Sequence, residues 1–308
     1  MNRYKTQQNE SLTGLCRLLG INRQVYYRSI HINTRRRKLI DKVLDMVRDI
    51  RLQMPRIGTR KLFYLLLDKL KPLKVGRDKL FSILRANNLL IKPKRSYHIT
   101  TDSDHRFKKH KNLIENVTPN RPEQIWVCDI TYIGNRANPM YLSLVTDAYS
   151  KKIVGYQVAN TLETKASVEA LKMAIKNRSY RKASLTHHSD RGFQYCSADY
   201  QKILNKNSIT CSMTESYDPY ANAIAERVNG ILKQEFIGYD RNIDLKTMSQ
   251  LVENSVNIYN QIRPHYSCGY KTPQQMHQQC EVKIRNYKKK SPIDYTQLSP
   301  LNEYLKSK

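Results

Sequence analysis

No stretch of the sequence approaches the roughly 18 consecutive apolar residues that a membrane-spanning helix needs. The first residues, Met1 to Gln8, are polar and lack the apolar centre of an export signal. The six cysteines include no C-x-x-C pair, so they are expected to be free thiols in a reducing cytoplasm. Since only Cys16 lies in the first 120 residues, an amino-terminal zinc module is also disfavoured. We therefore expect a cytoplasmic protein without a membrane partner.

Acidic residues are scarce as well. The 308 residues contain 26 acidic and 54 basic side chains, which gives a formal net charge of +28. The first 120 residues carry 28 of the basic and 9 of the acidic side chains, so the amino-terminal part is the more cationic. A charge excess of this size favours polyanions, and nucleic acid is the expected partner because its phosphates release counterions when they are neutralised. We expect a nucleoid-associated protein.

Residues 1–35 are expected to form a segment resembling a helix-turn-helix. Two short apolar-periodic stretches meet at Gly20, and Asn22 is suited to cap the second. Arg23 and Arg28 would then lie on its exposed side, where they are candidate DNA contacts. A plain helical hairpin remains the alternative.

Residues 36–90 have further helical periodicity and are expected to form a small DNA-binding bundle. Arg60 and Lys61 are its candidate phosphate contacts, although a solvated charged face would have the same pattern. Periodicity fails over residues 91–120, where basic residues accumulate among polar ones, and we interpret this stretch as a cationic linker. The basic residues 281–308 are expected to form a tail.

A mixed α/β core is expected over residues 121–280. Five stretches rich in β-branched and apolar residues predict strands, at residues 125–133, 140–146, 153–158, 183–188 and 209–213. Asp129 lies in the middle of the first, where an ionised carboxylate is costly to bury without a partner, so either its pKa rises or a cation binds there. The helix before the fourth strand predicts a right-handed crossover and a parallel strand. Asp190 follows that strand, at the end where ligands of such sheets gather.

A helix is expected from Asn222 onward. At about 100° per residue, Asn222, Glu226, Asn229 and Lys233 share one face, while apolar residues occupy another. A charged face exposed to solvent would look similar. Glu226 follows Asp190 with 35 residues between them. Three acids from separate elements suit Mg²⁺, which prefers oxygen ligands, and we expect Asp129, Asp190 and Glu226 to form one magnesium site in which Mn²⁺ can substitute.

These residues resemble the motifs of the DDE transposases of the insertion-sequence-three family, whose core is like that of retroviral integrases. Asp129 in W-x-x-D-I-T-Y, Asp190 in H-S-D-R-G and Glu226 in N-A-I-A-E-R-V-N-G correspond to the three acids of the family. Lys233, seven residues after the glutamate, matches its basic residue, and Y-N-x-x-R-P-H at residues 259–265 matches a further motif. Tyr156, where the family often has tryptophan, and the turn at residues 135–139 depart from the pattern without touching the acids.

The resemblance implies an RNase H-like fold, a mixed five-stranded sheet with flanking helices. It also implies a transposase that uses Mg²⁺ to cut double-stranded DNA at the ends of a mobile element and to join the strands to a target, with Lys233, Arg227 and Asn222 near the phosphates. The family's catalytic protein is often the second of two overlapping frames, so a helix-turn-helix product of the upstream frame is an expected partner, beside a second copy of the chain. A nuclease without strand transfer and a DNA-binding regulator with structural acids are the alternatives.

Overall fold

The computed structural model describes residues 11–92, 110–115, 117–135, 138–214, 222–238 and 243–282. Most of the predicted linker, residues 215–221 and nearly all of the predicted tail lie outside these ranges. Within them, no helix is long and apolar enough to cross a membrane. All six cysteines are described, and none forms a disulfide.

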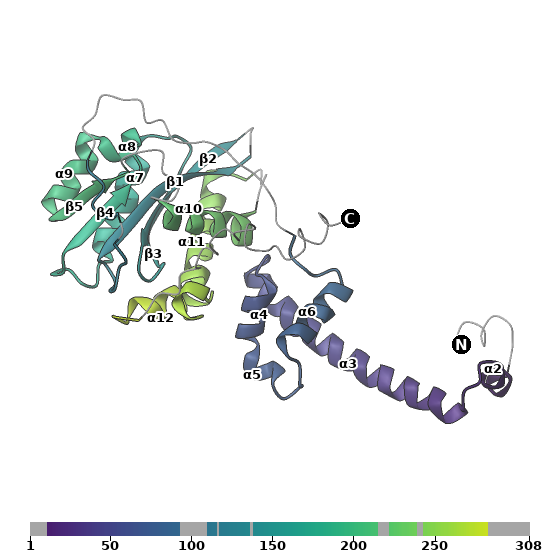
Figure 1. Ribbon diagram of the computed structural model, residues 1–308. Coiled ribbons are helices and arrows are strands. Elements are labelled where there is room, and N and C mark those ends of the chain that lie inside the picture. The colour runs from purple at the N-terminus through teal and green to yellow at the C-terminus, as the bar shows by residue number, and fades with distance from the viewer. Residues whose placement is uncertain are drawn as a thin grey trace, which may run out of the picture.

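The amino-terminal part is helical, and its long helix points away from the rest of the molecule (Figure 1). The helices are α2 (Leu12–Leu18), α3 (Arg23–Gln53), α4 (Thr59–Leu65), α5 (Leu67–Leu70) and α6 (Arg77–Ala86). The division predicted at residues 35 and 36 lies inside α3, which continues for 31 residues because neither glycine nor proline interrupts it.

The junction of α2 and α3 has the predicted turn and the predicted Asn22 cap, and Ser11 caps the start of α2. Gly20 has φ +64°, a conformation that glycine adopts without strain. The side chain of Ser11 accepts a hydrogen bond from Gly14 N, and that of Asn22 accepts one from Gln24 N at 2.9 Å. Both caps satisfy amides that have no partner within the helix, so two separate helices begin where the sequence predicts them.

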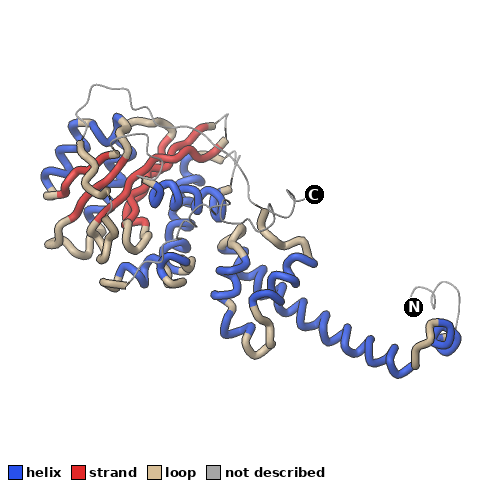
Figure 2. Tube along the Cα trace, viewed as in Figure 1, coloured by secondary structure: helices blue, strands red, loops and turns tan. Residues whose placement is uncertain are grey.

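Five strands form one mixed sheet in the order β3-β2-β1-β4-β5 (Figure 2). They are β1 (Ile125–Gly134), β2 (Pro139–Asp147), β3 (Ile153–Ala159), β4 (Leu185–Ser189) and β5 (Ile209–Met213). The first three are antiparallel neighbours, whereas β4 is parallel to both β1 and β5. The predicted mixed five-stranded sheet is confirmed, and so is the parallel strand after the crossover helix.

Helices cover both faces of this sheet. One face packs against α7 (Thr164–Lys176), α8 (Phe193–Cys196) and α9 (Ala198–Lys206) through a cluster that includes Trp126 and Leu171. The other packs against α10 (Ala223–Ile231), the π-helical turn η1 (Leu232–Ile237) and α11 (Leu245–Gln261). A short 3₁₀ turn, η2 (Tyr266–Cys268), and α12 (Pro273–His277) follow.

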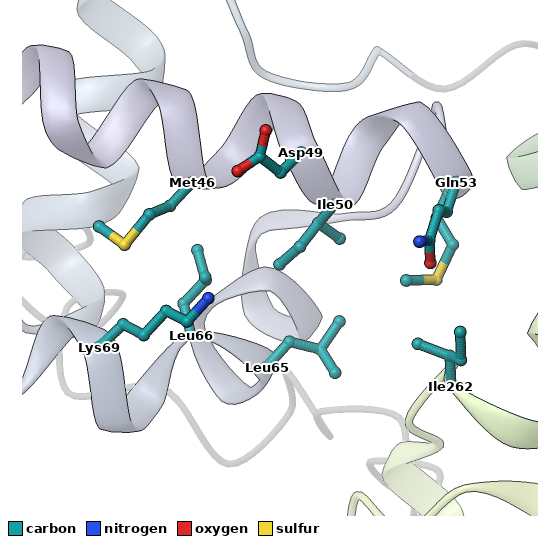
Figure 3. A pocket seen from close by; sticks show the side chains of 9 residues that line it. Met46, Asp49, Ile50, Gln53, Leu65, Leu66, Lys69 and Ile262 are labelled. Atoms are coloured by element: carbon teal, nitrogen blue, oxygen red, sulfur yellow. The ribbon is translucent and has the colours of Figure 1, made fainter.

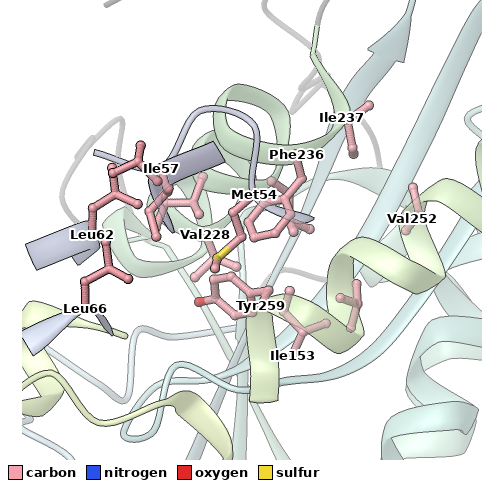
Figure 4. Close-up of a cluster of buried hydrophobic side chains, with 14 of the residues drawn as sticks. Met54, Ile57, Leu62, Leu66, Ile153, Val228, Phe236, Ile237, Val252 and Tyr259 are labelled. Atoms are coloured by element: carbon pink, nitrogen blue, oxygen red, sulfur yellow. The ribbon is translucent and has the colours of Figure 1, made fainter. Parts of the chain in front are cut away.

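The helical bundle and the sheet share one hydrophobic cluster. Figure 4 shows Met54 and Leu62 of the bundle packed against Val228, Phe236 and Tyr259 of the core. All five side chains are at most 5% exposed. Beside this cluster, Ile262 faces α3 and α5 across a pocket of about 270 Å³ (Figure 3). Because burial of apolar surface is the main stabilising term in folding, the two regions form one folded unit.

Part of the predicted linker belongs to the sheet. Met213 N donates a hydrogen bond to Lys111 O at 3.2 Å, and Leu113 N donates one to the side chain of Ser212 at 2.8 Å. Residues 111–113 therefore cover the open edge of β5, which satisfies backbone groups that an edge strand leaves unpaired. These residues of the predicted linker thus contact the sheet.

Candidate active site

Asp129 lies in the middle of β1, on the sheet face that α10 covers. Its Oδ1 accepts a hydrogen bond from Ile130 N at 2.9 Å, and its Oδ2 accepts one from the side-chain amide of Asn229 at 2.7 Å. Asn229 belongs to α10, so the same helix that carries Glu226 is attached directly to the aspartate.

The pKa of Asp129 is raised to about 7, first by burial and then by repulsion from Asp190, with a smaller contribution from Glu226. The hydrogen bond from Asn229 lowers the pKa but does not outweigh these effects. The negative charges of all three acids therefore act at one place on the sheet. A carboxyl group in such surroundings keeps its proton near neutral pH unless a cation replaces it.

Asp190 follows the last residue of β4, at the end of the sheet predicted for ligands. Its Oδ1 accepts a hydrogen bond from Gly192 N at 3.0 Å. A Cβ atom at position 192 would come within 3.0 Å of the same oxygen and 3.1 Å of Gln194 Oε1. A side chain at position 192 would therefore crowd these two oxygens, although the backbone there, with φ −59°, is open to any residue.

Glu226 lies in the first turn of α10. The residue as a whole is exposed, but partial burial of its carboxyl group raises the pKa of that group. Among the residues that the structure describes, no three His, Cys, Asp or Glu side chains already form a cluster able to hold a metal ion. The charges of Asp190 and Glu226 thus both act on Asp129, while the described side chains do not form a ready-made ligand set.

Two asparagines of this region have buried carbonyl oxygens. Oδ1 of Asn222 and Oδ1 of Asn229 have no hydrogen-bond partner among the described residues. A buried amide oxygen without a partner is costly unless water or another ligand binds to it. Together with the carboxylates, they make a set of oxygen atoms of the kind that Mg²⁺ binds directly or through water.

Lys233 and Asn222, both predicted to contact DNA, have different surroundings in the structure. The ammonium group of Lys233 lies 3.3 Å from Thr131 Oγ1, and its pKa is lowered by burial and raised by the charge of Asp129. The amide of Asn222 donates to Cys128 O at 2.9 Å, and the residue is only 7% exposed. For Asn222 the prediction of DNA contact is replaced by a structural finding: its amide ties the start of α10 to β1.

Of the other predicted DNA contacts, Arg227 directly follows one of the acids, Glu226, and the rest belong to the helical bundle. Arg23 and Arg28 are exposed near the outer end of α3, and Arg60 and Arg227 are exposed on α4 and α10. Lys61, in contrast, donates a hydrogen bond to Glu235 Oε1 at 3.0 Å, and its side chain is 20% exposed. Its charge is already paired inside the protein, so we no longer count it among the DNA contacts.

His187 and His188 lie just before Asp190, and neither is part of the predicted site. Nε2 of His187 is 2.8 Å from Tyr200 Oη, and Nδ1 of His188 is 2.9 Å from Ser212 Oγ. Both rings are completely buried. Burial lowers the pKa of His187 to about 3, so this ring is neutral and has a structural role.

Sequence reasoning missed Asn229, Glu235 and Arg263 as residues that organise this region. For Asn229 a signal was present, because it shares a helix face with Glu226 and Lys233. The motif around Arg263 was visible, but its partner Glu235 was not.

Comparison with known proteins supports a single family. Two family models described as "Integrase core domain" match residues 119–219 and 207–273. Among solved structures, the chain is similar to the magnesium-bound catalytic core of HTLV-2 integrase in its trimeric form, with 19% identity, a TM-score of 0.40, and coverage of 52% of this chain and 99% of that one. It is also similar to a chain of the simian T-cell lymphotropic virus intasome, with 19% identity, a TM-score of 0.46, and coverage of 75% and 78%.

Closer relatives come from bacterial insertion sequences. A 31 kDa protein of insertion element IS600 from Shigella sonnei is 31% identical over 264 residues, covering 84% of this chain and 96% of its own. Transposase InsF of insertion sequence IS3A from Escherichia coli (strain K12) is 30% identical over 279 residues, covering 88% and 95%. The integrase-core matches and the five-stranded sheet agree with this identity along nearly the whole chain. The protein belongs to the insertion-sequence-three family of transposases.

Proposed function

We propose that this transposase cuts DNA at the ends of its insertion sequence and joins the freed 3′ ends to target DNA, with Asp129, Asp190 and Glu226 as the catalytic acids. The observation that carries the proposal is the place of Asp129, a partly buried carboxyl group on β1 whose pKa is raised by burial and by the charges of Asp190 and Glu226. Its hydrogen bonds from Ile130 N and Asn229 do not outweigh these effects, which favours a bound cation as the compensating charge.

The residues present suit a divalent cation. Asp129 and Asp190 would hold Mg²⁺ or Mn²⁺ together, and Glu226, exposed on the first turn of α10, would turn its carboxylate toward them. When bound, the metal supplies Lewis-acid stabilisation of the charge on the attacked phosphate. Asp129 would give up the proton on its carboxyl group as the cation binds, because its pKa is near neutrality. The ammonium group of Lys233 would bind a phosphate oxygen beside Asp129.

Both chemical steps require an oxygen nucleophile aligned with the bond that breaks. In the first step, water attacks the phosphodiester and releases a 3′-OH; in the second, this hydroxyl attacks a phosphodiester of the target and displaces its 3′ oxygen. The acids and Lys233 would align both attacks through the phosphate, and no covalent protein intermediate forms.

We expect Glu226→Gln to remove both cutting and joining, because the amide retains the shape of the side chain without its charge. The assay incubates purified protein with end-sequence DNA and Mg²⁺ or Mn²⁺, and separates cut from joined strands. Glu253→Gln, which changes an exposed glutamate of α11, is the matched control. Joining by Glu226→Gln at the rate of the unmutated protein would remove Glu226 from the site.

The same assay separates the two other functions. An RNase H-like nuclease gives cut strands without joined ones, and a DNA-binding regulator gives a complex without either product.

Because joining needs two element ends, we further propose that the active form contains at least two copies of the chain. We also propose that the helix-turn-helix product of an upstream overlapping frame assists recognition of the terminal repeats.

For DNA binding by the bundle, we propose a basic groove of about 940 Å³ between α3 and the start of α6. Arg35, Arg36 and Lys79 line it together with His31, over the apolar side chains of Leu39 and Leu73. It contains no acidic residue among its lining side chains, so it suits the phosphates of a DNA backbone.

Replacing Arg35, Arg36 and Lys79 together by alanine is expected to weaken DNA binding by about tenfold or more near physiological salt. The slope of log K against log salt should also fall by about two to three, since each lost phosphate contact removes roughly 0.9. Fluorescence anisotropy in EDTA measures both quantities without catalysis. A control variant loses the same charge at Arg48, Lys74 and Lys172, and an equal effect there would show that only net charge matters.

A further inference from the structure

The motif at residues 259–265 has no part in the chemistry proposed above, yet its polar residues Asn260, Arg263 and His265 are at most 9% exposed. Arg263 is 1% exposed and donates two hydrogen bonds to Glu235, from Nε at 2.7 Å and from Nη2 at 2.8 Å. Its Nη1 lies 2.8 Å from His265 Nε2. This paired geometry is the strong form of the arginine–carboxylate interaction.

Glu235 has a second cationic partner, which comes from the helical bundle. Lys61 of α4 donates to its Oε1 at 3.0 Å, and Arg56 N donates to its backbone oxygen at 3.3 Å. Burial alone raises the pKa of Glu235, but the hydrogen bonds and charges of Arg263 and Lys61 outweigh burial and lower it. Glu235 is therefore ionised, and one carboxylate joins the bundle, η1 and the end of α11.

The segment that contains Glu235 also carries the residues near the acids. α10 and η1 follow each other without a break, and they carry Glu226, Asn229, Lys233 and Glu235. Towards β1 the segment is held by Asn222 at Cys128, by Asn229 at Asp129 and by Lys233 at Thr131. Glu235 is the attachment at its other end. A π-helical turn leaves helical backbone with a weaker hydrogen-bond ladder, so its position depends on such contacts.

We propose that Glu235, held by Arg263 and Lys61, is a positioning residue that fixes α10 and η1 over Asp129, and that Lys61 makes the placement of Glu226 and Lys233 depend on the bundle. The inference rests on the proposed function, since it concerns how the same acids are placed. It gives the motif at residues 259–265 a role in assembling the site and gives Lys61 a role other than DNA contact.

Lys61→Met and Arg60→Met separate these roles. Both variants lose one charge at neighbouring positions of α4, and methionine retains an unbranched side chain that packs where the lysine stem lies. Hydrogen exchange of the amides of residues 223–237 and DNA anisotropy are measured in EDTA, and the Mg²⁺ concentration for half-maximal cutting is measured separately.

For Lys61→Met we expect about tenfold faster exchange across residues 223–237, the loss typical of a hydrogen bond to a charged group. DNA affinity should remain within about twofold, and the Mg²⁺ requirement should rise by about fivefold or more. Lys61→Arg should restore all three. Arg60→Met should instead weaken DNA binding and lower the salt slope by about one, without changing exchange.

Unchanged exchange in a folded Lys61→Met protein would overturn the proposal, and so would a fall in DNA affinity like that of Arg60→Met. If Lys61→Met melts below the assay temperature, Arg263→Lys, which preserves the charge but not the paired geometry, tests the same attachment. Exchange and anisotropy require no catalysis, so absence of joining by the unmutated protein would refute the proposed function and leave these comparisons valid.

Discussion

Replacing Asp129 by asparagine is expected to abolish cutting and joining while raising the melting temperature of the metal-free protein at pH 8. Loss of several kcal/mol of charge stabilisation at the metal corresponds to a rate lower by about 10³-fold. The gain in stability has a separate cause. Asparagine retains an oxygen that accepts the hydrogen bond from Ile130 N, but it carries no negative charge for Asp190 to repel.

The pH dependence of this gain follows from the direction of the pKa shift. The pKa of Asp129 is about 7 in the folded protein, compared with roughly 3.9 in an unfolded chain. The folded state therefore holds the proton more tightly, and the stability it gains in this way is lost as the pH rises from about 4 through about 7. The difference between Asp129→Asn and the unmutated protein should be small near pH 4 and complete by pH 8.

Thermal unfolding at several pH values measures the effect, with roughly 2 °C or more expected at pH 8. Millimolar Mn²⁺ should raise the melting temperature of the unmutated protein and not that of Asp129→Asn, since a ligand stabilises the state that binds it. The control is Asp147→Asn: Asp147 is buried in the same sheet but accepts from Glu123 N and Ser150 N, both at 2.7 Å, so that variant should lose stability. A loss of stability for Asp129→Asn as well would mean that Asp129 is structural.

Gly155→Ala is expected to destabilise the protein by about 3 kcal/mol or more. Gly155 lies on β3 where α7 crosses the sheet, and a Cβ atom there would come within 2.1 Å of Ala170 O and 2.9 Å of Ala174 N. Both are backbone atoms of α7, so no flexible side chain can move away and the helix and the strand must separate.

Urea denaturation of this variant should give a lower midpoint or an unfolded protein at 25 °C. Gly230→Ala is the matched control, because a Cβ atom on this helical glycine meets nothing within 4 Å among the described residues. It should gain up to about 1 kcal/mol from the better helix propensity of alanine. A stable Gly155→Ala protein would show that α7 packs less closely than the structure indicates.

The strands and the helix that carries Glu226 could be predicted from the sequence because their signals are local. β1 has β-branched and aromatic neighbours around Asp129, and α10 repeats polar and apolar residues at helical spacing. The mixed five-stranded sheet is also confirmed: the crossover rule predicted the parallel direction of β4, the family resemblance implied the fold, and the strand order came only from the structure.

What the sequence could not predict depends on partners far along the chain. Asn222 is buried against Cys128, 94 residues away, and Lys61 is paired with Glu235, 174 residues away. An exposed DNA contact and a buried pair have the same local pattern, and only the tertiary structure distinguishes them. The single helix α3 was missed because residues 31–38 are almost entirely polar, although nothing in them ends a helix.

The continuity of α3 also sets how much of a duplex one chain can cover. Its 31 residues rise about 46 Å, from Arg23 at the outer end to Gln53 beside the cluster shared with the core. One turn of DNA rises about 34 Å. A straight duplex that touched Arg23, the basic groove and the acids would be protected from nuclease over more than one turn.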